Sequence, residues 1–119
     1  MLYTVTEAVP SFTEEPSNPS LVNEGDNITL RWTYNIGGTF RDSTFTLVRT
    51  GSTIALKDIS GLSVAPAFSD HVQVIISDSE AALTLLHVNI TDNGDYRYSI
   101  RNTAFMATES VVKVFVQCK

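Results

Sequence analysis

Apolar and polar residues alternate along several short stretches of this chain. In the clearest stretch, polar residues separate Ile28, Leu30, Trp32 and Tyr34. A period of two places one set of side chains on one face of an extended strand. The same period recurs over residues 45–47, 72–76, 83–85, 96–100 and 112–116, with turn-forming residues between these stretches. No stretch has a convincing helical period, so the sequence predicts an all-β fold. A second sheet must cover the apolar face of the first, as in a sandwich or a barrel.

Size and charge limit what such a fold can bind. A chain of 119 residues holds one domain, and a composition of 43% hydrophobic and 18% charged residues is typical of a folded chain. The net charge of −5 disfavours nonspecific binding to nucleic acid or to anionic membranes. No run approaches the roughly 20 apolar residues needed to cross a bilayer. We therefore expect any leader or membrane anchor to lie outside these residues.

Proline content separates the beginning of the chain from the rest. Residues 1–19 contain three prolines, which are not tolerated in a central strand. We expect these residues to form an extended lead-in and a first strand at a sheet edge. Residues 20–117 form the predicted domain, and residues 118–119 begin a linker to a following domain.

The segment from Asp92 to Tyr98 carries the most specific motif of the sequence. It reads Asp-Asn-Gly-Asp-Tyr-Arg-Tyr, in which Gly94 permits a tight turn and Tyr96 can return its hydroxyl to the upstream backbone. This run resembles the Asp-x-Gly-x-Tyr-x-Cys motif at the start of strand F in immunoglobulin domains. The resemblance implies a V-type immunoglobulin-like β-sandwich of two antiparallel sheets. The interval between residues 50 and 70 leaves room for the two additional strands of that type.

The disulfide-forming cysteines and the core tryptophan of such domains are replaced in this chain. The two cysteines of the family map onto Trp32 and Tyr98, and the core tryptophan maps onto Phe45. Cys118 is the one cysteine of the chain, so no internal disulfide can form. A native disulfide stabilises a small domain by roughly 2–5 kcal/mol, and we expect packed aromatic rings to offset its absence. The predicted core contains Trp32, Phe45, Leu85, Tyr96 and Tyr98.

The resemblance also predicts an ion pair next to the motif. Asp70-His71-Val72 maps to the start of strand D, where V-type domains place an arginine that pairs with the aspartate of the motif. His71 occupies the arginine position, and Asp92 is the aspartate. We therefore expect His71 to pair with Asp92.

No arrangement of residues indicates catalysis or metal binding. No motif brings together a nucleophile, a base and an orienting group. Neither His71 nor His87 has a cysteine or histidine partner at metal-ligand spacing. We expect a chain that is not an enzyme and that holds no metal and no cofactor.

Two segments fit the acceptor motif for N-glycosylation. They are Asn27-Ile28-Thr29 and Asn89-Ile90-Thr91, whereas a proline excludes Asn18. Asn27 opens a predicted strand, and Asn89 lies just before the Asp92 motif, so sugars on both could point into solvent. Together with the fold, the two motifs favour an extracellular location with sugars on Asn27 and Asn89.

The sheet that contains strands C and F carries the predicted binding surface on its solvent side. Alternation places on that side Thr46, Val48, Arg97, Ser99 and Arg101. The loop after strand F adds Phe105 and Met106, and aromatic, Met and Arg side chains are enriched in interface cores. The alternative is that Phe105 and Met106 fold back onto the sandwich.

A V-type domain without the two cysteines and the core tryptophan resembles the membrane-distal domains of the allorecognition receptors of colonial hydroids. Those receptors bind identical copies on neighbouring cells. The resemblance implies the extracellular part of a single-pass membrane protein at the cell surface, whose partner is the same protein on an opposing cell. We expect no nucleic acid and no small-molecule substrate. Two alternatives stay open: a heterophilic immune-type or viral decoy receptor domain, and a structural spacer.

Overall fold

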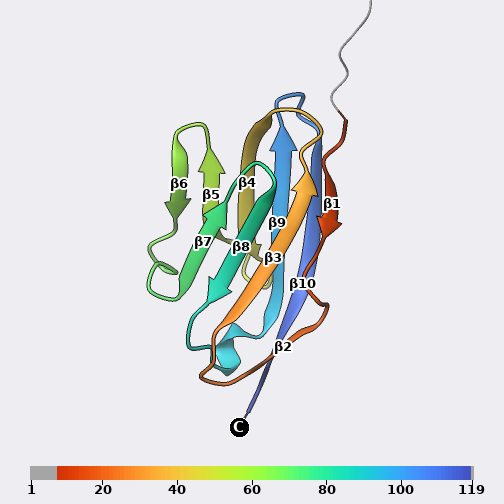
Figure 1. Cartoon of the computed structure of the whole chain (residues 1–119). Coiled ribbons are helices and arrows are strands. Elements are labelled where there is room, and N and C mark those ends of the chain that lie inside the picture. Colours follow the sequence, from red (N-terminus) through yellow and green to blue (C-terminus); the bar gives the residue numbers. More distant parts are fainter. Residues whose placement is uncertain (1–7, 119) are drawn as a thin grey trace, which may run out of the picture.

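Ten strands and one short 3-10 helix form the described part of the computed structural model, residues 8–118 (Figure 1). The elements are β1 (Ser11–Glu14), β2 (Ser20–Asn23), β3 (Ile28–Asn35), β4 (Phe40–Leu47), β5 (Ser52–Asp58), β6 (Gly61–Val64), β7 (Val72–Ile76), β8 (Glu80–Leu85), η1 (Ile90–Asp92), β9 (Gly94–Asn102) and β10 (Ala107–Gln117). Within residues 8–118, no helix is long and apolar enough to cross a membrane.

The strands form two sheets that pack against each other (Figure 1). One sheet has the order β1-β3-β8-β7, and the other has the order β2-β10-β9-β4-β5-β6. Neighbouring strands run antiparallel except β2 and β10, which pair in parallel at the edge of the larger sheet. The strands β5 and β6 fill the interval between residues 50 and 70. The two sheets confirm the predicted V-type sandwich.

The lead-in is integrated into the sandwich. β1 pairs with β3 at the edge of the smaller sheet, and β2 pairs with β10 in the larger sheet. Between them, Glu15 accepts a hydrogen bond from Ser110, and Asn18 accepts one from the N–H of Lys113 at 3.1 Å. Residues 1–7 of the predicted lead-in and residue 119 of the predicted linker lie outside the described residues.

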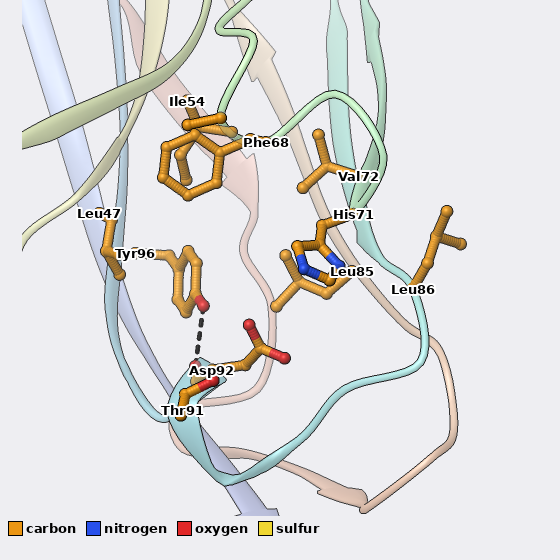
Figure 2. A pocket seen from close by; sticks show the side chains of 11 residues that line it. Leu47, Ile54, Phe68, His71, Val72, Leu85, Leu86, Thr91, Asp92 and Tyr96 are labelled. Carbon is orange, nitrogen blue, oxygen red and sulfur yellow. Dashed lines mark hydrogen bonds between the residues drawn. The ribbon is translucent and has the colours of Figure 1, made fainter.

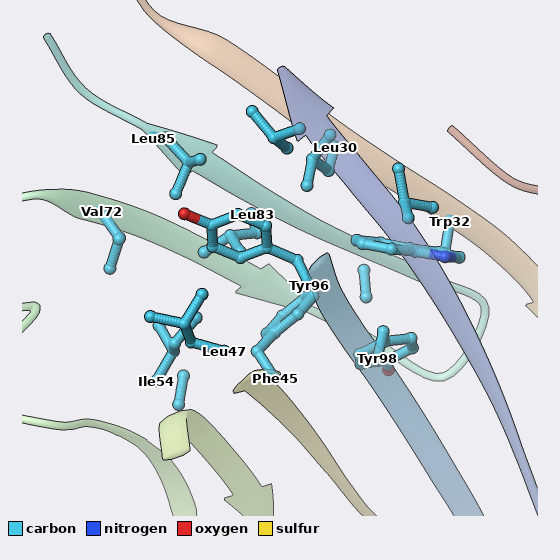
Figure 3. Packing of buried hydrophobic residues seen from close by; sticks show 14 of the residues in the cluster. Leu30, Trp32, Phe45, Leu47, Ile54, Val72, Leu83, Leu85, Tyr96 and Tyr98 are labelled. Carbon is cyan, nitrogen blue, oxygen red and sulfur yellow. The ribbon is translucent and has the colours of Figure 1, made fainter. Parts of the chain in front are cut away.

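Three aromatic rings fill the centre of the core, where the family places its disulfide and tryptophan. Trp32, Phe45 and Tyr98 are fully buried. Their ring centroids lie 5.6 Å apart for Trp32 and Phe45, 5.5 Å for Trp32 and Tyr98, and 4.6 Å for Phe45 and Tyr98 (Figure 3). Leu85 and Tyr96 are buried as well. All five residues predicted for the core therefore lie in it.

The polar atoms of this cluster differ in how they are satisfied. Tyr34 donates its hydroxyl proton to the carbonyl oxygen of Ser77 at 2.6 Å. The Tyr98 hydroxyl, 2.9 Å from that of Tyr34, therefore donates to the Tyr34 oxygen. The buried Nε1 of Trp32 has no hydrogen-bond partner in the described structure. A buried donor without a partner costs about 1–3 kcal/mol, which reduces what the indole contributes to stability.

Tyr96 forms the predicted tyrosine corner. Its hydroxyl donates to the carbonyl oxygen of Asp92 at 2.8 Å (Figure 2). The preceding helix η1 is closed by a capping box, in which Asn89 accepts from the N–H of Thr91 and Asp92 accepts from the N–H of Asn89, each at 2.9 Å. Gly94, at a φ of +147°, then turns the chain into β9. The motif therefore fixes where β9 enters the sheet.

The predicted ion pair between His71 and Asp92 is absent from the contacts of residues 8–118. Both side chains line a pocket of about 80 Å³ near η1 and the start of β7 (Figure 2). The Asp92 carboxylate is used by the capping box.

Candidate protein-binding face

The solvent side of the larger sheet brings most of the predicted binding residues together. Residues opposite each other in a sheet share a face, so the register identifies this surface. We call it the outer face, and the members that matter below, on and next to β2, β4, β9 and β10, are Leu21, Asp42, Thr44, Thr46, Val48, Asp95, Arg97, Ser99, Arg101, Glu109, Val111, Lys113 and Phe115.

Both arginines of the outer face are paired with carboxylates of the same face. Arg101 donates two hydrogen bonds to Asp42, from Nε to Oδ1 at 2.9 Å and from Nη2 to Oδ2 at 2.6 Å. These hydrogen bonds, together with the carboxylate charge, raise the pKa of the Arg101 guanidinium. Arg97 Nε lies 3.4 Å from Glu109 Oε2. An approaching partner therefore meets ion pairs rather than isolated positive charges.

Thr46 does not present itself to a partner as predicted. It lies on the outer face but is only 8% exposed. Its strand is central, and Arg97 of β9 and Thr53 of β5 flank it in register on either side. Thr46 is therefore a covered residue, because alternation determines the face that a side chain takes and not what its neighbours cover.

The loop between β9 and β10 holds Phe105 in solvent. Phe105 is 65% exposed, and its φ of +62° lies in the left-handed region that bulky residues rarely adopt. The guanidinium of Arg41 lies 4.3 Å from the centroid of its ring, which is a cation-π contact. Met106 is half-buried. Phe105 does not fold back onto the sandwich, and Met106 does so in part.

Asn102 organises this loop from inside the domain. It is fully buried at the end of β9. Its Nδ2 donates to the carbonyl oxygens of Ala8 at 2.8 Å and Ile36 at 3.2 Å, and its Oδ1 accepts from the N–H groups of Ala104 at 3.0 Å and Met106 at 3.2 Å. Asn102 is not among the residues predicted from the sequence. The sequence does contain an indication of its burial, because Asn102 continues the alternating series of inward-facing residues Tyr96, Tyr98 and Ile100.

Replacing Asn102 by alanine is expected to lower the free energy of unfolding by about 2–3 kcal/mol, because buried backbone groups lose their partners. Asn23→Ala, at an exposed asparagine of β2, is the control and should change little. Hydrogen exchange should show faster exchange at the amides of Ala104 and Met106 in the Asn102 variant alone. Unchanged exchange at both amides would show that Asn102 does not hold the loop.

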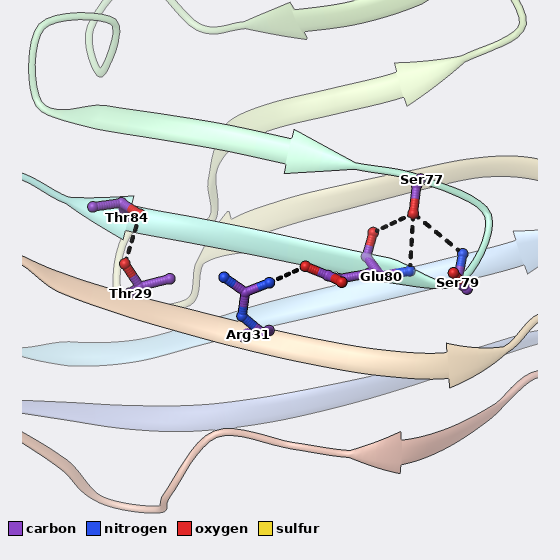
Figure 4. A network of polar contacts seen from close by, with 6 residues as sticks. All are labelled: Thr29, Arg31, Ser77, Ser79, Glu80 and Thr84. Carbon is purple, nitrogen blue, oxygen red and sulfur yellow. Dashed lines mark hydrogen bonds and ion pairs between the residues drawn. The ribbon is translucent and has the colours of Figure 1, made fainter.

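On the opposite face, which the smaller sheet forms, polar side chains pair with one another. Thr29 and Thr84 share a hydrogen bond of 2.8 Å across β3 and β8, and Arg31 pairs with Glu80 on the same two strands (Figure 4). Among the described residues of β1, β3, β8 and β7, Ile75 is the one large hydrophobic residue that is exposed, with 64% of its surface accessible. This face offers matched positions for control substitutions.

The two glycosylation motifs lie at the end of the domain that holds η1. Asn27 and Asn89 are both exposed. Asn27 accepts a hydrogen bond from the N–H of His87 at 2.9 Å, and Asn89 caps η1. Both asparagines lie in connecting loops, so sugars on them would leave the centre of the outer face open.

Two packed sheets with these strand orders and a tyrosine corner define an immunoglobulin-like fold of the V-type. No protein-family model matches the chain, and no curated protein sequence matches it.

Solved structures with the same fold include proteins of different kinds. The titin domains Z1Z2 in complex with telethonin superpose with a TM-score of 0.74 and 21% identity, over 97% of this chain and 51% of that chain. A chicken TCR gives a TM-score of 0.71 and 12% identity, over 89% of this chain and 50% of that chain. The ZIG-8 IG1 homodimer gives a TM-score of 0.65 and 19% identity, over 93% of this chain and 89% of that chain. This chain thus spans about half of the titin and TCR chains, and the likeness is one of fold.

Proposed function

We propose that this chain is an extracellular recognition domain of a single-pass cell-surface receptor, and that its outer face binds a second copy on a neighbouring cell. In this proposal the domain acts by binding a protein and carries out no chemistry. The fold is compatible with this role, because the ZIG-8 domain that shares it forms a homodimer and the titin domains that share it bind telethonin.

Charge balance on the outer face is the observation that carries the proposal. Its charged residues in register on β4, β9 and β10 are three basic ones, Arg97, Arg101 and Lys113, and three acidic ones, Asp42, Asp95 and Glu109. Arg41, at the register shift of β4, adds one positive charge 3.5 Å from Asp42. The whole chain has a net charge of −5, which therefore falls on the rest of the molecule. Two copies that meet through the outer face avoid the like-charge repulsion that most other approaches would meet.

The size of the face suits a weak contact that many copies reinforce. A domain of this size contributes roughly 800 Å² to an interface of standard size. Receptors that meet between two cells act together, so avidity raises the strength of adhesion far above that of one pair. Weak self-association in solution is therefore expected.

Coated beads test the proposal directly. Beads that carry the chain at high density should cluster with one another and not with uncoated beads. Arg97→Glu, at the centre of the outer face, should reduce clustering because it opposes Glu109 and reverses the local charge balance. Arg31→Glu on the opposite face is the matched control and should leave clustering unchanged.

The outcomes of this experiment separate the alternatives. Beads that stay dispersed, although circular dichroism shows folded protein, would reject self-binding. Saturable binding of such beads to cells would then favour a heterophilic partner, and the absence of any binding would favour a spacer. Clustering that survives Arg97→Glu but not Arg31→Glu would move the interface to the smaller sheet.

A further inference from the structure

Exposed apolar side chains gather at one corner of the outer face. Leu21 on β2 is 59% exposed and lies directly opposite Phe115 on β10, which is 50% exposed. Val111 lies two residues before Lys113 on the same side of β10 and is 43% exposed. Val48, 37% exposed, lies on the other side of Asp95. We call Leu21, Val48, Asp95, Val111, Lys113 and Phe115 the β10 corner.

A hollow lies beside the most prominent ring of this corner. It measures about 280 Å³ and is lined by Asn93, Gly94, Lys113, Val114 and Phe115. β9 begins at Gly94, which pairs with Val114 in register, so the hollow lies where the pairing of β9 with β10 starts. The Asn93 side chain is turned toward β10, where it accepts a hydrogen bond from the N–H of Val116. An exposed aromatic ring and a hollow able to receive one are thus neighbours on a single surface.

Lys113 lines the same hollow, and an opposite charge lies next to it. Asp95 and Lys113 are paired in register across β9 and β10. No ion pair between them occurs among the contacts of the described chain, in contrast to the two arginine pairs of the outer face. The corner therefore contains one free charge of each sign as well as its apolar side chains.

From these features we infer that the β10 corner is the apolar centre of a two-fold contact with a second copy of this chain. This inference rests on the proposed self-binding. A two-fold axis that passes between ring and hollow places Phe115 of each copy in the hollow of the other. The same axis brings Lys113 of each copy toward Asp95 of the other, so the charges of the corner attract rather than repel.

Self-complementarity is the reason to choose a second copy as the occupant. An unrelated partner would have to supply both a ring and a hollow at matching positions, whereas a second copy supplies both by symmetry. The corner also lies within the charge-balanced outer face, so the contact can spread over neighbouring residues of β9 and β10. Leu21, Val48 and Val111 would surround the inserted rings and exclude water from them.

Apolar-to-acidic substitutions test the position of the contact. Phe115→Asp should weaken self-association of the chain at least about tenfold, because a central aromatic anchor is lost. Sedimentation at rising concentration and bead clustering both measure this effect. Ile75→Asp introduces the same charge at a similarly exposed strand position on the opposite face, and it should change neither measurement. Leu21→Asp is a second variant of the corner, and thermal unfolding verifies that each variant is folded.

A charge exchange tests the pairing across the axis. Lys113→Glu leaves two acidic residues at each corner, and Asp95→Lys leaves two basic ones, so each variant should lose self-association. A mixture of the two variants should associate again, because acidic corners then meet basic corners. The matched control is a mixture of Arg31→Glu and Glu80→Arg, which changes the same charges on the opposite face and should behave like the wild type.

The possible results distinguish this inference from the proposed function. If the wild-type chain self-associates and Phe115→Asp and Leu21→Asp do so equally well, the β10 corner is not the contact, and self-binding still holds. Loss of association in Phe105→Asp alone would place the contact at the loop between β9 and β10. If the wild-type chain never self-associates, the proposed self-binding fails before any variant is compared.

Discussion

Replacing Trp32 by alanine is expected to lower the free energy of unfolding by about 3–5 kcal/mol, the range for truncating a buried large aromatic side chain. Trp32 is fully buried and contacts both Phe45 and Tyr98, so its removal leaves a cavity between the two sheets. Chemical denaturation followed by circular dichroism measures the change, because the variant contains no tryptophan. A loss under about 0.5 kcal/mol would show that the rings do not support the core.

Trp32→Phe is the matched variant for this experiment. It retains an aromatic ring against Phe45 and removes the Nε1–H that has no partner within residues 8–118. The cavity left by the smaller ring lowers the free energy of unfolding, whereas removal of the unpartnered N–H raises it. The expected net loss is therefore below about 2 kcal/mol. A loss as large as that of Trp32→Ala would mean that Nε1 has a partner, such as a buried water.

The aromatic cluster accounts for how a sandwich of this type is stable without its disulfide. A disulfide acts mainly on the unfolded chain, whereas Trp32, Phe45 and Tyr98 act in the folded state by burying area and by ring contacts. Each ring contact adds about 0.5–1.5 kcal/mol beyond burial, so three contacts approach the roughly 2–5 kcal/mol of a disulfide. Stability then depends on the packing of β3 against β4 and β9 rather than on redox conditions.

Alternation and one motif were enough to predict the fold and its core. The period of two along β3, β9 and β10 identified the buried face of each strand, and every residue named for the core is buried. The Asp92 motif predicted the tyrosine corner, because Gly94 and Tyr96 satisfy a local geometry that the sequence alone specifies. The parallel pairing of β2 with β10 joins segments far apart in the chain, and no local pattern indicates it.

The candidate binding face was predicted less completely because it depends on contacts between strands. Arg97 and Arg101 were predicted to lie on this face, but their carboxylate partners on neighbouring strands, Glu109 and Asp42, were not predicted. The hollow at Gly94 is formed by residues of two strands that are distant in the sequence, because Lys113, Val114 and Phe115 of β10 line it as well. Such features depend on register, and register follows from the assembled sheets rather than from any one strand.

Raising the pH above about 10, the ordinary pKa of tyrosine, is expected to unfold the domain steeply. Burial raises the pKa of Tyr34 to about 12, and burial also raises the pKa of Tyr96 and of Tyr98. The folded state therefore holds these three phenol protons at a pH where the unfolded chain has lost them. Their contribution to stability is complete below about pH 10 and is lost as the pH rises toward the folded pKa values.

The expected slope is large because three groups act in the same direction. Each tyrosine lowers the free energy of unfolding by at most about 1.4 kcal/mol per pH unit, so the three together approach about 4 kcal/mol per unit. Over two pH units the loss approaches about 8 kcal/mol, which exceeds the stability of a domain near the lower end of the usual range of about 5–15 kcal/mol. The tyrosinate absorbance of Tyr34, Tyr96 and Tyr98 and the circular dichroism, followed together during titration, should change in one cooperative step.

Tyr98→Phe provides the internal control for this titration. The variant loses the hydrogen bond from Tyr98 to Tyr34, so its stability is lower than that of the wild type below about pH 10. Its free energy of unfolding should nevertheless fall less steeply above about pH 10, because two buried tyrosines rather than three then bind protons differently in the two states. The slope separates the ionisation of Tyr98 from its packing, which a single stability value does not. Gradual ionisation of the three tyrosines near pH 10 in a domain that stays folded would show that their hydroxyls are accessible to water.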